Sequence, residues 1–305
     1  MENLFRIRGI LISIYKRYET INNYILKFIF AYIVFSGINN SLGVSTTLNK
    51  WYIVLILAIL ASVLSGKWTL LFSILLVSVN LFSVSVEGPI IITCLMLITY
   101  LVFVRMFPEM SYIVLLMPIC YYFKIPYIIP LCIGVLVGIR GIVSVTIGTF
   151  VWYFSKYLSE LVNMESKQLV DIPETLASMN KYLISSMSQN TEMIISILIF
   201  IAVIAAVCII NRLSINYASY IAVTVGAAIN VIGFMMGIII MDLDINIFFT
   251  LISAIISLLI VYMILFFRIV LNYKEAQKVQ FEDDDYYYYV KLIPKIKIRH
   301  LPKNN

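Results

Sequence analysis

Residues 112–138 read YIVLLMPICYYFKIPYIIPLCIGVLVG, and the length of the apolar runs in this stretch decides how the chain can fold. Two runs, 112–123 and 126–138, are joined by Lys124 and Ile125 and hold 12 and 13 residues. Coiled as helices they reach about 18–20 Å, whereas the hydrocarbon core of a bilayer is roughly 30 Å thick. We therefore expect either two thin spans or one re-entrant hairpin, and both alternatives return the chain to the same face.

The rest of the chain is also apolar. Hydrophobic residues make up 62% and charged residues 12% of the 305 residues, against about 45–50% and about 25% in soluble domains. This composition excludes an ordinary soluble enzyme, a disordered chain and a disulfide scaffold. Eight further stretches approach the length of about 20 residues that a membrane-spanning helix needs. They lie near residues 25–42, 51–66, 68–86, 88–107, 141–159, 193–211, 215–241 and 245–267.

The predicted fold class follows from these stretches. We expect an all-α polytopic membrane protein with eight transmembrane helices plus a Pro/Gly-broken re-entrant hairpin, or with ten helices, and a short cytoplasmic tail that resembles a β-hairpin. We divide the chain into five segments. These are an amphipathic cytoplasmic N-terminal segment (1–24), a first membrane bundle (25–158), an external amphipathic helix (159–192), a second membrane bundle (193–270) and a cytoplasmic tail (271–305).

The basic residues predict the orientation of the chain. With the N-terminus inside, 17 of the 22 Lys and Arg residues fall on the cytoplasmic face and 5 fall outside. Cytoplasmic loops of membrane proteins carry such an excess of Lys and Arg. We therefore expect a multi-pass protein of the bacterial plasma membrane, with both termini in the cytoplasm and the lipid bilayer as its first partner.

Two polar segments carry patterns of their own. In the external loop a capping-box-like start is followed by apolar residues at helical spacing, which predicts a one-sided helix; the residues are Asp171, Glu174, Leu176, Met179, Leu183 and Met187. In the tail, alternation over 278–282 and 286–299 around an acidic cluster predicts a β-hairpin. Its exposed rings and cations are candidates for docking a partner; they are Tyr286, Tyr287, Tyr288, Tyr289, Lys295 and Lys297.

A candidate cavity is predicted where the backbone is broken. Broken helices at membrane depth are tolerated where protein or a water-filled cavity satisfies the freed backbone groups, and they point to binding sites in transporters. The cavity candidates are Pro118, Pro126, Pro130, Gly134, Gly138, Arg140, Thr146 and Asn230. In the alternative interpretation, Arg140 only anchors a cytoplasmic turn, the short segments are thin or tilted spans, and the small residues around Asn230 serve close helix packing.

The sequence lacks the residues that several kinds of chemistry need. The single histidine, His300, lies in the last six residues, and no Ser-His, Cys-His or HExxH arrangement can be built. The four cysteines have no metal-ligand spacing, and every acidic residue sits at the end of an apolar segment, which argues against proton coupling through a buried carboxylate. We expect no enzyme, no catalytic residue, no cofactor, no metal site and no nucleic-acid partner.

Two functions fit these observations. The first is a permease-like or channel-like membrane component with its cavity at the broken segment and an unknown substrate. The second is a non-transporting scaffold that recruits partners through its tail and its external helix. Both interpretations are compatible with a homo-oligomer or with a partner in a membrane complex.

Overall fold

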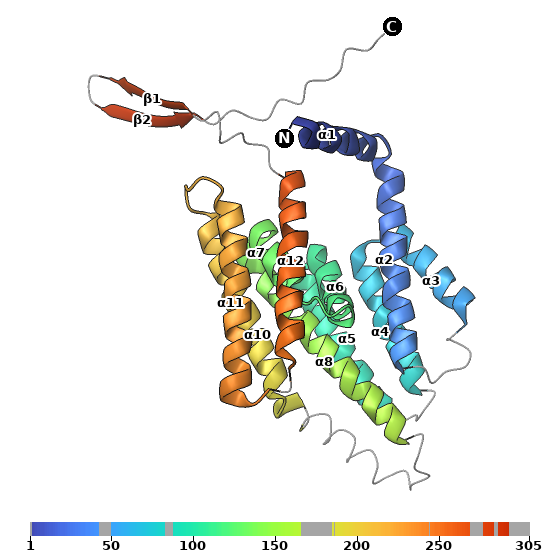
Figure 1. Cartoon of the computed structure of the whole chain (residues 1–305). Coiled ribbons are helices and arrows are strands. Elements are labelled where there is room, and N and C mark those ends of the chain that lie inside the picture. The colour runs from blue at the N-terminus through green and yellow to red at the C-terminus, as the bar shows by residue number, and fades with distance from the viewer. Residues whose placement is uncertain are drawn as a thin grey trace.

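The computed structural model describes residues 2–42, 50–82, 88–165, 185, 187–243, 245–268, 277–283 and 286–292. Helices dominate this part of the chain, and a single two-stranded sheet follows them (Figure 1). The longer elements are α1 (Glu2–Arg17), α2 (Glu19–Leu42), α3 (Trp51–Val63), α4 (Gly66–Phe82), α5 (Gly88–Met106), α6 (Ser111–Tyr122), α7 (Ile128–Leu136), α8 (Ile142–Glu165), α10 (Thr191–Asn211), α11 (Ala218–Met241), α12 (Ile247–Arg268), β1 (Gln277–Glu282) and β2 (Tyr287–Leu292). Two single-turn 3₁₀ helices, η1 (Pro108–Met110) and η2 (Gly138–Gly141), connect α5 to α6 and α7 to α8.

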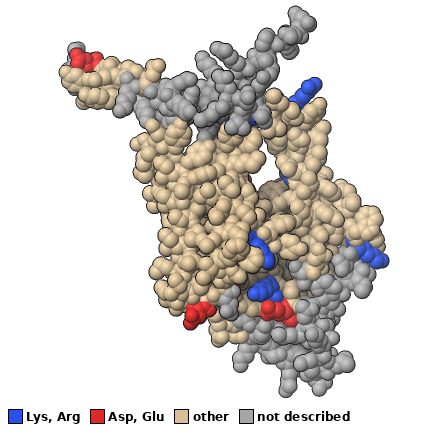
Figure 2. Space-filling model, viewed as in Figure 1, with Lys and Arg blue, Asp and Glu red and all other residues tan. Residues whose placement is uncertain are grey.

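Four helices of the described chain are long and apolar enough to cross a membrane. They are α2, α10, α11 and α12, and a fifth span results if the bent pair Met96–Met106 and Pro108–Tyr122 counts as one. These apolar helices indicate insertion into a membrane, and Figure 2 shows an uncharged flank over α11 and α12.

The expected count of eight spans is not supported. Helices occupy all eight predicted stretches, but α3 has 13 and α4 has 17 residues, which at 1.5 Å per residue gives about 20 and 26 Å against a core of roughly 30 Å. The predicted span 51–66 ends early because Leu64 leaves the helix with an extended backbone. Pro108 lies at the start of η1, and there the chain bends by 117° between Met96–Met106 and Pro108–Tyr122.

The predicted turn at Lys124 and Ile125 forms a hairpin of two short helices, α6 and α7. Lys124 has a left-handed backbone with φ of 59°, its N–H donates to the Tyr121 carbonyl, and the Ile125 N–H donates to the Cys120 carbonyl. This is the Schellman motif that satisfies the last carbonyls of a helix.

The ammonium of Lys124 lies 4.9 Å from the ring centre of Phe249 at the start of α12, and Arg268 at the end of α12 donates to the Val135 carbonyl. The turn and α7 therefore lie beside α12, with Lys124 near its start and Val135 near its end.

The buried side chains form two main clusters. We call the cluster of α2, α3, α4, α5 and α6 the first core, and the cluster around α7, α8, α10, α11 and α12 the second core. Every residue of α7 except Leu136 is buried, and α7 packs against α10, α11 and α12. A helix that is apolar all round is expected in such a fully enclosed place. The broken segment 112–138 is thus shared, with α6 reaching the first core and α7 at the centre of the second.

The N-terminal segment is a separate helix. We expected one amphipathic stretch up to residue 24, whereas α1 ends at Arg17 and α2 begins at Glu19. Figure 1 shows α1 lying across the end of α2, close to the end of α12. The corner is held by the Tyr15 hydroxyl, which donates to the Asn23 side-chain oxygen at 3.0 Å.

The tail contains the predicted β-hairpin. Strands β1 and β2 pair antiparallel, with Val279 opposite Val290 and Phe281 opposite Tyr288. The Asp283 N–H donates to the Tyr286 carbonyl across the acidic turn. The strand β2 ends at Leu292, and the rest of the predicted second strand, with Lys295 and Lys297, lies outside the described residues.

Most of the predicted external helix also lies outside the described residues, including Asp171, Glu174, Leu176, Met179 and Leu183. Its last member, Met187, is buried in a small cluster with Tyr153, Leu158 and Met193. Helix α8 extends to Glu165, beyond the predicted end of the span at residue 159.

Candidate functional site

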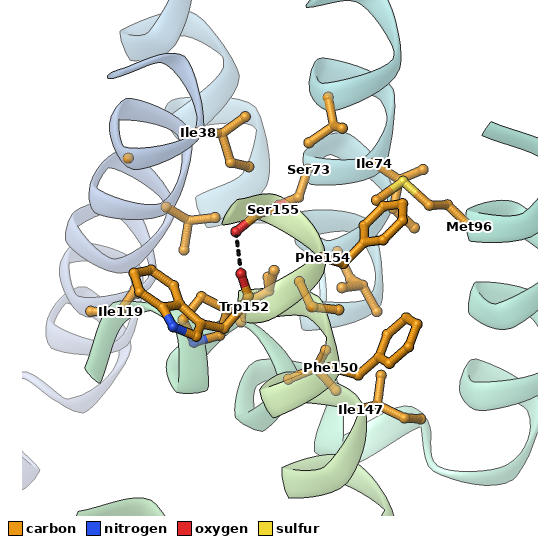
Figure 3. A pocket seen from close by; sticks show the side chains of 18 of the residues that line it. Ile38, Ser73, Ile74, Met96, Ile119, Ile147, Phe150, Trp152, Phe154 and Ser155 are labelled. Atoms are coloured by element: carbon orange, nitrogen blue, oxygen red, sulfur yellow. Dashed lines mark hydrogen bonds between the residues drawn. The ribbon is translucent and has the colours of Figure 1, made fainter. Parts of the chain in front are cut away.

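A hollow suited to a ligand lies inside the first half of the bundle, and we call it the first-bundle cavity. It measures about 340 Å³ and is enclosed by α2, α4, α5, α6 and α8. Ligand pockets of proteins commonly measure about 300–1,000 Å³. Figure 3 shows Phe150 and Phe154 of α8 directed to the same side of the cavity as Ile74 and Met96, while Trp152 points to the opposite side, toward Ile119.

The inner surface of the cavity is apolar and uncharged. No Lys, Arg, Asp, Glu or His is among its described lining residues. The hydroxyl of Ser73 donates to the Thr69 carbonyl at 2.9 Å, and the hydroxyl of Ser155 donates to the Trp152 carbonyl at 2.8 Å. These two hydroxyls are therefore bonded to the backbone of their own helices, and the aliphatic and aromatic side chains set the character of the wall.

The cavity opens on the flank of the bundle. Its lining includes residues with substantial exposure to the outside, namely Tyr32 and Ile33 of α2, Tyr122 of α6 and Phe150 of α8, with exposed fractions between 37% and 63%. Figure 2 shows that the surface beside α2 is hollowed. If α2 spans a membrane, this opening faces acyl chains and not water.

Gly37 marks the free space most directly. Apart from its own helix backbone, a Cβ atom built at Gly37 meets no atom of the described residues within 4 Å, although Gly37 lies in the wall of the cavity. Most other glycines of the described helices are different: at Gly66, Gly134, Gly141, Gly148 and Gly226 an added Cβ would come within 3 Å of a neighbouring side chain. Gly37 is therefore the position where a larger side chain can enter the cavity without a clash.

The predicted cavity residues lie in several places. Pro118 lines the first-bundle cavity. Pro130, Gly134 and Gly138 are buried, Pro126 is half-buried at the hairpin turn, Arg140 is exposed on η2, and Thr146 is half-buried on α8. The structure brings only Pro118 of this set to the cavity.

Asn230 lies at the centre of the second core. Its side chain has no exposure, and neither amide atom has a hydrogen-bond partner among the described residues. Its neighbours one turn away on α11 touch α7: a Cβ at Gly226 would lie 2.7 Å from Leu131, and the ring of Phe234 lies 5.1 Å from that of Tyr127. Asn230 therefore faces the densely packed α7 segment.

The small residues of the broken segment serve close packing. A Cβ at Gly134 would lie 2.7 Å from Val207 of α10, and Gly138 adopts φ of 78°, a left-handed conformation that suits glycine. Arg268 and Asn211 both donate to the Val135 carbonyl, at 3.1 and 3.4 Å. The freed carbonyl at the end of α7 is thus satisfied by protein side chains.

The docking candidates of the tail are exposed where they are described. Exposed fractions are 67% for Tyr286, 68% for Tyr287 and 80% for Tyr289, whereas Tyr288 is stacked on Phe281 with ring centres 5.0 Å apart. Tyr288 and Phe281 share one face of the hairpin, and Tyr287 and Tyr289 share the other.

The lining of the first-bundle cavity offers apolar contacts to a bound molecule. The described residues contain no group of three or more His, Cys, Asp or Glu side chains that could hold a metal ion. Of the four cysteines, Cys120, Cys132 and Cys208 are buried in the bundle. The first-bundle cavity therefore suits the retention of an apolar molecule.

Sequence reasoning missed this cavity, although α2 carries a signal for it. Tyr32, Ser36 and Asn40 recur every four residues and so lie on one face of α2 beside Gly37. All four residues line the cavity. A face of polar and small residues on an otherwise apolar helix therefore indicates the side of α2 that lines the cavity.

The fold and the site define a class: an apolar helical bundle, with helices able to cross a membrane, that encloses an uncharged cavity. Comparison with protein-family models, with curated proteins and with solved structures finds no match to this chain.

Proposed function

We propose that this chain is a permease-like component of a bacterial plasma membrane that takes up a lipophilic molecule in the first-bundle cavity. The observation that supports this proposal is the uncharged lining of a cavity of about 340 Å³ that opens on the flank of the bundle. The 17 to 5 distribution of basic residues supports an orientation with both termini in the cytoplasm.

The physical argument concerns the source of the ligand. A charged solute would lose its hydration in this cavity without gaining a charged partner, which is costly. A lipid chain or another apolar molecule incurs no such cost, because it leaves one apolar environment for another. For the same reason the cavity is a poor water-filled channel, so we favour the permease-like over the channel-like form of the proposal.

The test uses a variant that fills the cavity. In the purified full-length chain, reconstituted in lipid nanodiscs with a phospholipid that carries a photoactivatable acyl chain, we expect cross-links to lining residues of α2 and α8. Gly37→Leu extends a side chain into open space, so it should abolish these cross-links and leave the fold intact. Ile56→Phe, on the exposed face of α3, is the matched control and should keep them.

Two outcomes would contradict the proposal. One is cross-linking confined to the outer surface of the helices, with the lining residues unlabelled. The other is equal labelling of the lining residues in the parent chain and in Gly37→Leu, because that result would mean that the probe does not occupy the space beside Gly37.

The scaffold function remains a second candidate because of the tail. The hairpin presents the exposed rings of Tyr287 and Tyr289 on a two-stranded sheet, and such a sheet is marginal in water without further cover. A partner protein or the tail of a second copy would provide that cover. We therefore propose that the hairpin docks a partner if the cavity proves empty.

This candidate is tested by changing only the exposed face. Tyr287→Ser with Tyr289→Ser should remove chemical cross-links between the tail and a partner or second copy in membranes, while the control Gln280→Ser on the same face retains them. An unchanged set of cross-links in the double variant would argue against the scaffold.

A further inference from the structure

Helix α1 is held at its C-terminal end and near its middle. At the corner, the Tyr15 hydroxyl donates to Asn23, and the Asn22 side chain donates to the Tyr15 carbonyl at 3.4 Å. Near the middle, the Arg8 guanidinium donates to the Phe267 carbonyl of α12 at 2.9 Å and lies 5.7 Å from the ring centre of Phe266. These contacts fix α1 across the end of the bundle, as Figure 1 shows.

The exposed side of α1 is apolar. Ile10, Leu11, Ile14 and Tyr15 have exposed fractions between 42% and 52% in the chain alone. At 3.6 residues per turn their side chains span an arc of about 140°. An apolar arc of this width on a surface helix is normally covered, and a helix lying flat at a membrane surface covers it with acyl chains.

The two basic residues lie at different distances from this arc. Around the helix axis, Arg17 lies about 20° from Ile10 and so borders the exposed arc, whereas Lys16 lies about 100° beyond Tyr15, on the polar side. Ser13 lies between them on the polar side. Long basic side chains at the edges of an apolar face can extend their charged ends to lipid headgroups while their stems stay in apolar surroundings.

Arg8 is the exception among the described cations of α1, because it lies on the apolar side. Its side chain is buried, and burial lowers the pKa of Arg8 from its usual value, although a guanidinium stays charged in proteins. The Phe267 carbonyl at the end of α12 receives this charge. A cation at the C-terminal end of a helix is favourable because the last carbonyls carry partial negative charge. Arg8 therefore binds the end of α12, whereas the charged ends of Lys16 and Arg17 can interact with a partner outside the chain.

We propose that α1 is a docking surface for anionic phospholipids of the leaflet on its side of the membrane. Ile10, Leu11 and Ile14 enter the acyl region, Arg17 binds a lipid phosphate at the edge of the apolar arc, and Lys16 on the polar side adds to the attraction of the anionic headgroups. Charge complementarity selects anionic over zwitterionic lipid, since each basic residue near an anionic leaflet adds to the attraction.

The test measures hydrogen exchange of the full-length chain in nanodiscs of phosphatidylcholine alone and of phosphatidylcholine mixed with phosphatidylglycerol. We expect the amides of residues 9–17 to exchange more slowly in the anionic discs, by up to about 30-fold for two basic contacts. Lys16→Gln with Arg17→Gln should abolish this difference, and high salt should reduce it. Lys50→Gln, before α3 at the opposite end of α2, is the control and should leave it unchanged.

Three results would overturn the proposal. The first is equal exchange of α1 in the two lipid compositions. The second is a difference that survives in the double variant. The third is faster exchange of the double variant in phosphatidylcholine alone, since that would show that Lys16 and Arg17 hold α1 for structural reasons unrelated to anionic lipid.

Discussion

The first and second cores contain similar residues but are packed differently, and their glycines show the difference. In α11 of the second core, a Cβ at Gly226 would lie 2.4 Å from Val207 and 2.7 Å from Leu131. In α2 of the first core, a Cβ at Gly37 would meet nothing within 4 Å. A Cβ at Gly66 of α4, also in the first core, would lie within 3 Å of Tyr112, so the open packing of the first core is local to the cavity beside Gly37.

The two cores also show that a break in the backbone does not by itself mark the position of a cavity. The prolines and glycines of the 112–138 stretch end and turn helices, and the segment they create, α7, is the most enclosed element of the second core. The cavity lies among helices of which only α6 contains a proline within its lining. A broken helix can therefore be a way of inserting a short apolar segment into a bundle.

The largest expected effect is that of Gly226→Leu. Overfilling a packed core typically costs 1–3 kcal/mol and occasionally more, and here two neighbouring side chains stand within 3 Å of the new Cβ. We expect a loss of about 3 kcal/mol or more in unfolding free energy, measured by thermal or denaturant unfolding in detergent. A stability equal to that of the parent chain would show that the second core is looser than described.

The next effect has the opposite sign. Asn230→Leu replaces a buried amide whose two polar atoms have no partner among the described residues. An unsatisfied buried polar group costs roughly 1–3 kcal/mol, so the variant should unfold at a higher temperature. A destabilised variant would instead indicate that the amide is bonded to a buried water or another unseen group.

A smaller effect is expected for the matched asparagine of the first core. Asn80 is also buried, but its amide donates to the Asn39 side-chain oxygen at 3.2 Å and to the Leu76 carbonyl at 2.9 Å. Hydrogen bonds between membrane helices contribute about 0.6 kcal/mol on average and up to about 2 kcal/mol. Asn80→Leu should therefore lower the unfolding temperature, and an increase like that of Asn230→Leu would remove the contrast between the two cores.

The smallest effect on stability is expected for Gly37→Leu. The new side chain enters open space and replaces a residue that weakens helices by roughly 0.8–1.0 kcal/mol relative to alanine. The unfolding temperature should stay the same or rise slightly, as measured beside Gly226→Leu under identical conditions. A loss as large as that of Gly226→Leu would mean that the space beside Gly37 is closed in the folded protein.

The sequence predicts local features of this fold better than its long-range contacts. The predicted runs 112–123 and 126–138 match α6 and α7 to within two residues at each end, because proline, glycine and run length act locally. The alternation in the tail likewise predicts the paired strands. The predicted count of eight spans is not supported by the described residues, since composition does not show that α3 ends at Val63 or that the chain bends sharply at Phe107 and Pro108.

The position of the cavity could not be derived in the same way. Helices that are apolar on nearly all sides carry little to show which face meets which neighbour. The polar and small face of α2 indicates one side of that helix, but it does not show whether a distant side chain fills the space beside Gly37. The difference between Gly37 and Gly134 depends on residues distant in sequence: Val207 of α10 fills the space beside Gly134, whereas no side chain of the described residues comes within 4 Å of a Cβ at Gly37.

The most direct test of the contrast between the two cores is an experimental density map of the full-length chain in lipid nanodiscs. We predict elongated non-protein density in the cavity beside Gly37, between α2 and α8, and continuous side-chain packing around α7. A map in which α2 closes on α8 without such density, or in which a ligand lies beside Pro130 and Asn230, would contradict the account.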